Sequence, residues 1–188
     1  LCSSDLFLAR RLAQKPDTRV FAFVNDATRA FMDYLPPTVD DAPDIVLLGD
    51  GDDDWSYASL DRVLSFIHDG AELVASSPAR TFIGRDGRPH LDTGALVALF
   101  EASCGKSALV MGKPSAELSM LVAAEAGIEP ARMLFVGDDP AIDMEAAEAV
   151  GARSVLVLTG TGATAPRCPA PDKVIASIAE LPALLGIA

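Results

Sequence analysis

Short apolar runs alternate along the chain with longer segments in which apolar residues recur every three or four positions. Short runs of this kind are typical of buried strands, and they occupy Val20–Val24, Ile45–Leu48 and Leu73–Ala75. The longer segments predict helices, at Ser59–Phe66 and Gly94–Glu101. Strands that alternate with helices are typical of α/β proteins, and we expect that class here.

A further pair of predicted strands flanks a helix in the C-terminal half. The first is the apolar stretch within Ser107–Pro114, which ends in Gly112, and the second is Met133–Val136. The second suits a strand that is buried on both faces of a parallel sheet. A helical pattern begins at Ser115 and is closed by Gly127. Because such crossovers are right-handed, we expect two parallel strands in one βαβ unit.

The helix after this second strand has recognisable ends. Asp139 is a good N-cap residue, Pro140 a good first helical residue, and Gly151 a plausible stop. Beyond it, the Gly, Pro, Thr and Ala content of 160–172 predicts a loop, and 178–185 predicts a final helix.

Carboxylates gather at the end of the second strand. Asp138 and Asp139 follow Gly137 directly, and Asp143 lies about one turn into the helix with its Cβ tilted back toward Asp138. Open α/β sheets hold their ligands at the carboxyl ends of strands. Clustered carboxylates there suit Mg²⁺, which takes oxygen ligands and assists phosphate chemistry. The alternative is a capped helix whose acids complement its macrodipole.

Lys113 lies at the carboxyl end of the first strand. If the two strands are parallel neighbours, Lys113 and Asp138 project from the same edge of the sheet. A cation beside carboxylates can hold a phosphate dianion and keep the acids ionised. The alternative is a solvated lysine before a proline turn. The ordered pair is more specific than either half.

These residues resemble the motifs of a known family. Val110-Met-Gly-Lys-Pro-Ser115 followed by Val136-Gly-Asp-Asp-Pro-Ala-Ile-Asp143 is similar to the haloacid dehalogenase superfamily of phosphatases, in the branch of p-nitrophenylphosphatase-like and phosphoglycolate phosphatase-like enzymes. The resemblance extends over nearly all 188 residues. It implies an α/β fold with a Rossmann-like parallel-sheet core, incomplete at its N-terminus, and an inserted α/β cap domain. The implied limits are a core helix or linker at 1–16, the cap at 17–105 and the rest of the core at 106–188.

The resemblance also implies roles for the site residues. Lys113 would be catalytic and bind the substrate phosphate, Asp138 would bind Mg²⁺, and Asp143 would support both the metal and the chemistry. The implied function is Mg²⁺-dependent hydrolysis of small-molecule phosphate monoesters through an aspartyl-phosphate. The expected partner is therefore a small phosphorylated metabolite, and the cap is a candidate surface for a homodimer.

The nucleophile motif of the family is missing from this chain. Members open with an Asp-x-Asp strand end, and none precedes the cap here, where the chain begins with Leu1. Residues 1–12 look like the helix that follows the lost strands, so we expect a fragment of a longer protein that has no turnover by itself. A catalytically inactive interaction protein of this fold is the alternative. A response-regulator receiver is disfavoured, because it places its acidic pair before its lysine.

One departure bears on substrate. The family commonly has an Asn-x-Asp turn where this chain has Ser77-Pro-Ala-Arg80. Arg80 could bind an acidic substrate group, and a solvated loop arginine is the alternative.

Composition bears on the binding partners and the location that we expect for the protein. The 15 basic and 27 acidic residues give a net charge of −12, which opposes nucleic-acid binding. No apolar run approaches the roughly 20 residues needed to span a bilayer, and the 3 cysteines lack metal-ligand spacing. We therefore expect a cytoplasmic protein with no membrane partner.

Overall fold

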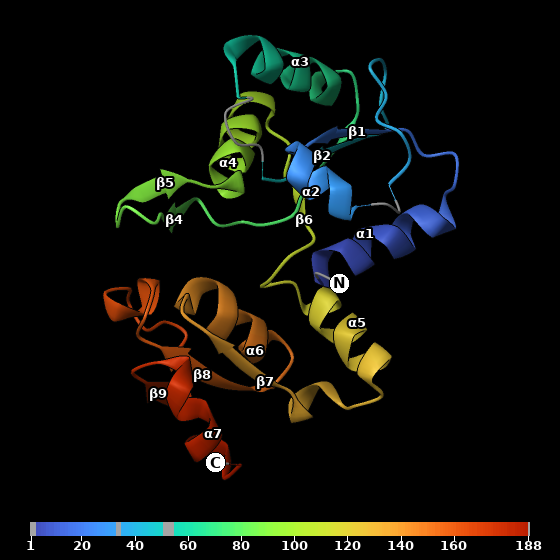
Figure 1. Cartoon of the computed structure of the whole chain (residues 1–188). Coiled ribbons are helices and arrows are strands. Elements are labelled where there is room, and N and C mark those ends of the chain that lie inside the picture. Colours follow the sequence, from blue (N-terminus) through green and yellow to red (C-terminus); the bar gives the residue numbers. More distant parts are fainter. Residues whose placement is uncertain (1–2, 33–34, 51–54, 188) are drawn as a thin grey trace. The chain divides into compact units, whose positions relative to one another are not determined.

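The computed structural model describes residues 3–32, 35–50 and 55–187. The chain forms two compact units, Leu1–Gly112 and Lys113–Ala188 (Figure 1). Each unit has its own parallel sheet and its own helices. The α/β class predicted from the sequence is confirmed.

The sheet of the first unit has four parallel strands in the order β1-β2-β3-β6. They are β1 (Val20–Phe23), β2 (Ile45–Leu48), β3 (Glu72–Ala75) and β6 (Leu109–Val110). The three strands expected in this part of the chain are thus all present.

Alternate residues of these strands enter different apolar clusters. Val46 and Leu48 of β2 pack with α3 (Tyr57–His68) and α4 (Thr93–Cys104). Ile45 and Leu47 join the other cluster, together with Leu12 of α1 (Ser3–Gln14) and with Met32, which follows α2 (Asp26–Phe31). Burial on both faces explains why β2 is a continuous apolar run with no polar alternation.

The hairpin of β4 (Thr81–Ile83) and β5 (Pro89–Leu91) was not predicted. All six of its strand residues are exposed. Its sequence therefore lacks the apolar run that identifies buried strands. His90 lies in β5.

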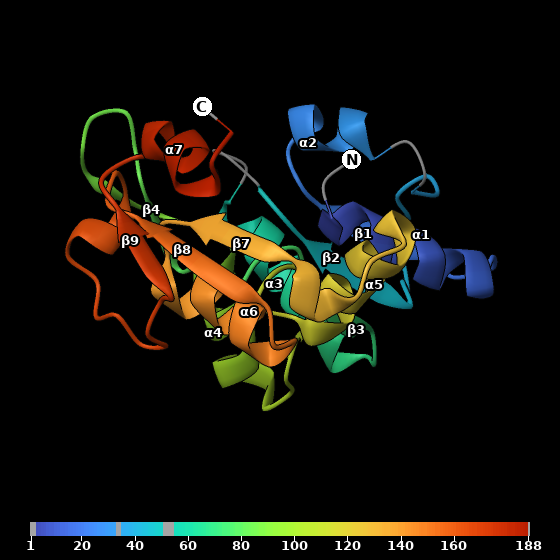
Figure 2. The ribbon, with the colours of Figure 1, turned by 90° about the horizontal axis from the view of Figure 1, so that it is seen from below.

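The second unit has a three-stranded parallel sheet in the order β7-β8-β9. The strands are β7 (Leu134–Gly137), β8 (Arg153–Val157) and β9 (Lys173–Ile175). Helix α6 lies along β7 and β8, as Figures 1 and 2 show. The helical segments are α5 (Ala116–Ala126), η2 (Pro130–Arg132), η3 (Pro140–Met144), α6 (Glu145–Ala149), η4 (Thr161–Ala163), η5 (Ile178–Glu180) and α7 (Leu181–Leu185).

Helix ends in this unit confirm the capping predictions. Ser115 caps α5, where its side chain accepts a hydrogen bond from the Leu118 N–H, and Gly127 ends it in the left-handed conformation. Asp139 caps the next helical segment, whose first residue is Pro140. That segment opens with a π-helical turn, which the sequence did not indicate.

Two expectations about strands were wrong. The stretch 107–114 contains only the two-residue strand β6, which pairs with β3 of the first unit, so the expected βαβ unit with β7 is not formed within the described residues. Met111, directly after β6, is buried in the core of the first unit. Strand β7 was expected to be buried on both faces, but all four residues are half-buried. In the described part of the chain it pairs only with β8.

The predicted domain limits at residues 16 and 105 stay predictions. Among the described residues, no helix is both long enough and apolar enough to cross a membrane.

Candidate functional site

Asp138 directly follows β7, and the segment after β8 holds it. The backbone N–H of Thr161 donates to Asp138 Oδ2 at 3.0 Å, and the Thr161 hydroxyl donates to the Asp138 carbonyl oxygen at 2.8 Å. Parallel neighbouring strands end at the same edge of a sheet, so the pairing of β7 with β8 brings these residues together.

Asp143 lies one helical turn further and is buried, with 5% of its surface exposed. Its Oδ1 forms an ion pair with Lys113 Nζ, and its Oδ2 accepts a hydrogen bond from the Asp139 N–H at 3.1 Å. The Lys113 side chain is 46% exposed, so solvent reaches one side of the pair. A buried carboxylate needs such partners because the loss of hydration is costly.

Asp139 has a different role from its two neighbours. Its Oδ1 accepts a hydrogen bond from the Ala141 N–H at 3.0 Å, as an N-cap residue does. Burial raises the pKa of Asp139 above its ordinary value, and the charges of Asp143 and Asp138 raise it further, against the lowering effect of the Ala141 hydrogen bond. Two further carboxylates close by therefore make Asp139 harder to ionise.

Two glycines allow the backbone to approach the acids. A Cβ atom on Gly137 would overlap the Asp143 carboxylate, and one on Gly160 would overlap the Asp138 carboxylate. Neither glycine has a positive φ in the structure, so the requirement is for space and not for an unusual backbone conformation.

The structure thus places three of the four predicted site residues in the second unit, with Lys113 and Asp143 in direct contact. Arg80 is exposed and precedes β4 of the first unit. Its backbone carbonyl accepts from the Asp92 N–H at 3.0 Å. Its predicted role in substrate binding stays a prediction.

Sequence reasoning missed Thr161. The segment 160–172 was predicted only to be a loop, and a threonine in a Gly- and Pro-rich loop carries no signal for a contact with an aspartate. The contact depends on the pairing of β7 with β8.

The donor set fits a hard cation in part. The described residues contain no group of three His, Cys, Asp or Glu side chains arranged to hold a metal ion. Mg²⁺ is, however, commonly held by only one or two protein carboxylates, with water and substrate phosphate supplying the other ligands. Asp138 directly follows β7, and Asp143 lies in the helical segment after it.

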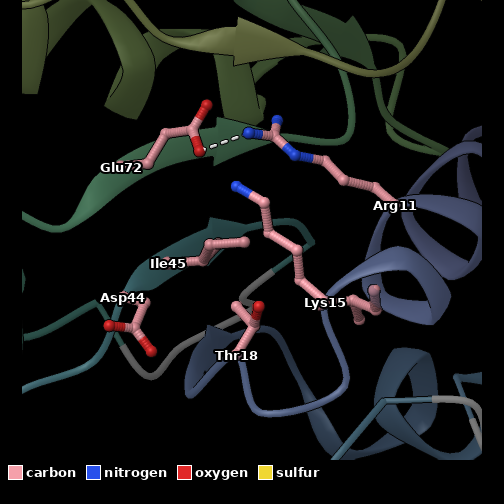
Figure 3. A pocket seen from close by; sticks show the side chains of 7 residues that line it. Arg11, Lys15, Thr18, Asp44, Ile45 and Glu72 are labelled. Carbon is pink, nitrogen blue, oxygen red and sulfur yellow. Dashed lines mark hydrogen bonds and ion pairs between the residues drawn. The ribbon is translucent and has the colours of Figure 1, made fainter.

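A separate hollow of about 310 Å³ lies in the first unit (Figure 3). Arg11 Nη2 and Glu72 Oε2 form an ion pair at 2.5 Å on its wall, and the Lys15 side chain points into it. Asp44 Oδ2 accepts from the Arg19 N–H at 2.8 Å. The negative charges of Asp44 and Glu72 offset the positive charges of the basic residues that line the hollow. The lining residues are Arg11, Leu12, Lys15, Thr18, Asp44, Ile45 and Glu72, none of which is a predicted site residue.

Comparison with known proteins finds a matching family model and similar proteins. Residues 110–181 match the family model described as HAD-hydrolase-like. The haloacid dehalogenase-like hydrolase domain-containing protein 2 of Bos taurus is 31% identical over 157 residues, which cover 84% of this chain and 59% of that protein. The chain therefore spans less than two thirds of this relative.

The solved structures that are similar to this chain include two phosphatases. The 4-nitrophenylphosphatase of Thermotoga maritima matches with a TM-score of 0.79 and 27% identity, over 96% of this chain and 70% of the other. The glycerol phosphate phosphatase of Mycobacterium tuberculosis, solved in complex with magnesium, matches with a TM-score of 0.75 and 26% identity, over 95% and 56%. The second unit thus combines a parallel sheet, Asp138 directly after β7, and the contact of Lys113 with Asp143 in the following helical segment. The partial family-model match, the relative and the solved structures together support placing the chain in the haloacid dehalogenase superfamily, in its p-nitrophenylphosphatase-like branch.

Proposed function

We propose that residues 113–188 supply the phosphate-binding lysine and the metal-binding acids of a Mg²⁺-dependent phosphatase. Its substrates are small-molecule phosphate monoesters. The observation that carries the proposal is the ion pair of Lys113 with buried Asp143, next to Asp138 at the end of β7. The magnesium complex of the M. tuberculosis relative supports the choice of metal.

The residues would divide the work as follows. Lys113 neutralises charge on the phosphoryl oxygens, and its half-exposed side chain can reach a ligand from solvent. Asp138 would hold Mg²⁺, and Asp143, whose two oxygens already bond Lys113 and the Asp139 N–H, would support the shell of the metal and orient Lys113. When bound, Mg²⁺ stabilises the negative charge that develops on the transferred phosphoryl group. Arg80 is the proposed contact for an acidic group of the substrate.

The nucleophile is proposed to be the first aspartate of an Asp-x-Asp motif, which attacks phosphorus and displaces the alcohol of the ester to form an aspartyl-phosphate. Water then hydrolyses this intermediate to inorganic phosphate and the free aspartate. This motif is absent before the cap in the 188 residues. We therefore expect the chain by itself to show no turnover of p-nitrophenyl phosphate, even with ample Mg²⁺. Turnover by the purified chain would require a different nucleophile.

Binding tests the site in the chain as it stands. In isothermal titration calorimetry, we expect wild-type chain to bind Mg²⁺, and Asp138→Asn to weaken that binding at least about tenfold because one anionic ligand is lost. With Mg²⁺ present, Lys113→Ala should weaken the binding of inorganic phosphate. Glu148→Gln is the matched control, because it removes one exposed negative charge from the same unit.

The same variants test catalysis in a form of the protein that carries an Asp-x-Asp segment N-terminal to Leu1. Asp138→Asn and Lys113→Ala should both depress turnover of p-nitrophenyl phosphate. Wild-type turnover in either variant would show that the site is misplaced. The cytoplasmic location stays a prediction from composition, and so does the lack of nucleic-acid partners.

A further inference from the structure

We propose that Thr161 is a positioning residue that makes the site select Mg²⁺ over Ca²⁺. It does so by occupying one carboxylate oxygen of Asp138 and leaving the other for the cation. The inference rests on the proposed function, because it concerns the metal ligand assigned there. It adds a residue outside the lysine and acidic motifs.

Thr161 contacts both the side chain and the backbone of Asp138. The Thr161 N–H donates to Oδ2 at 3.0 Å, and the Thr161 hydroxyl lies 3.5 Å from the same oxygen while donating to the Asp138 carbonyl at 2.8 Å. Within the described residues, Asp138 Oδ1 takes part in no hydrogen bond or ion pair. The two oxygens of this carboxylate are therefore not equivalent before any cation binds.

Because Gly160 and Gly162 have no side chains, the loop can lie close to Asp138. A Cβ on Gly160 would overlap Oδ2, and a Cβ on Gly162 would lie 2.8 Å from the Asp138 carbonyl oxygen. Gly162 is buried, and its Cβ would also meet the Val157 carbonyl at the end of β8, at 2.7 Å. The segment 160–162 thus lies close to both the side chain and the backbone of Asp138.

A fixed, one-sided carboxylate has a consequence for ion choice. Ca²⁺ takes six to eight oxygens and often binds a carboxylate through both of them, whereas Mg²⁺ requires octahedral geometry and usually binds through one. With Oδ2 engaged by Thr161, Asp138 offers a single oxygen. Loss of the Thr161 hydroxyl frees the backbone carbonyl and loosens the loop, so the carboxylate gains freedom to present both oxygens.

The test measures Mg²⁺ and Ca²⁺ affinities of the chain by calorimetry. Thr161→Val keeps the side-chain shape and removes the hydroxyl, and we expect it to weaken Mg²⁺ binding about tenfold, the lower end for a residue that orients a metal ligand. Ca²⁺ binding should weaken less, so the affinity ratio moves toward Ca²⁺. Thr161→Ser should restore the wild-type ratio. Thr164→Val, an exposed threonine of the same loop, is the control.

The outcomes separate the two proposals. If Asp138→Asn loses Mg²⁺ binding while Thr161→Val keeps the wild-type ratio, the inference is overturned and the proposed function stands. If the wild-type chain binds no Mg²⁺, both are overturned. A lower melting temperature of Thr161→Val with an unchanged ratio would show a structural role only, and again overturns the inference. Should Thr161→Val not fold, the wild-type chain decides, since Ca²⁺ binding as tight as Mg²⁺ binding contradicts the selectivity.

Discussion

Asp138 and Asp143 are fixed by different kinds of partner, although five positions separate them. Asp143 is buried against the charge of Lys113, whereas Asp138 receives neutral donors from Thr161. A buried carboxylate that loses its cation is left uncompensated, and this costs more than the loss of a neutral hydrogen bond. Lys113 therefore serves the stability of the site as well as its proposed chemistry.

Asp86 provides a test of electrostatics away from the site. The Arg88 N–H, donating at 3.0 Å, lowers the pKa of Asp86 below its ordinary value, and the His90 side chain, with Nε2 at 3.1 Å, lowers it further. A lowered pKa means that the ionised form stabilises the folded hairpin. This contribution is present above the ordinary pKa of an aspartate and is lost as pH falls through the lowered pKa.

We therefore expect Asp86→Asn to reduce the hydrogen-exchange protection of the hairpin amides at pH 6. The difference from wild type should shrink toward pH 2, as the pH falls through the lowered pKa of Asp86. Nuclear magnetic resonance of the amides of residues 84–91 measures this. An equal difference at both pH values would contradict the electrostatic origin.

The sequence could predict the ionic part of the site but not its neutral part. Lys113, Asp138 and Asp143 carry charges at recognisable positions after apolar runs. Thr161 acts through a backbone N–H, which every residue except proline has, and through a common hydroxyl. Only the register of β7 with β8 identifies it.

Helix α3 shows how much of an element is determined locally. Ser56 and Ser59 form a capping box, in which the Ser56 hydroxyl accepts from the Ser59 N–H at 3.1 Å and the Ser59 hydroxyl accepts from the Ser56 N–H at 2.9 Å. Val63 and Ile67 bury the opposite end of the helix in the core. The cap and the apolar spacing together define the helix.

Ser56→Ala should therefore destabilise the first unit by about 1 kcal/mol, the usual cost of losing a serine N-cap. Ser65→Ala is the matched control in the same helix. The Ser65 hydroxyl bonds back to the Asp61 carbonyl, a contact that does not support helices. Urea unfolding followed by circular dichroism gives both values. A cost for Ser65→Ala as large as that for Ser56→Ala would refute the capping argument.

Strands with few buried residues were not predicted correctly from the sequence. The hairpin β4–β5 was missed because its strand residues are exposed, and β6 was given too many residues and the wrong partner. The apolar run before Lys113 does not reveal which sheet it joins. Leu109 and Met111 pack in the core of the first unit, whereas Lys113 is the first residue of the second unit. Pattern alone does not distinguish these sheets.

For the whole molecule, the open question is self-association. The hairpin exposes three large apolar side chains, Phe82 at 49%, Ile83 at 54% and Leu91 at 65%. An isolated two-stranded sheet is marginally stable in water, and large exposed apolar side chains on it favour burial against another surface. These observations support the proposed homodimer through the cap, where the hairpin lies in the sequence.

We expect the chain to be dimeric at micromolar concentrations and Leu91→Glu to make it monomeric, because a charge at a dimer contact is costly to desolvate. Light scattering after size exclusion measures the mass. Met120→Glu places the same charge on a comparably exposed position, 50%, in the other unit, and should leave the dimer intact. Monomeric wild-type chain would exclude this dimer.

The two glycines that face the acids bear on how such sites are recognised in other sequences. Any side chain at position 137 or 160 would collide with Asp143 or Asp138. A homologous sequence could therefore retain every charged letter of the motif and still be unable to form the site, if either glycine were replaced. A search pattern that couples each aspartate to its facing glycine, one of them more than twenty positions downstream, would exclude such sequences, which a search for the acids alone would accept.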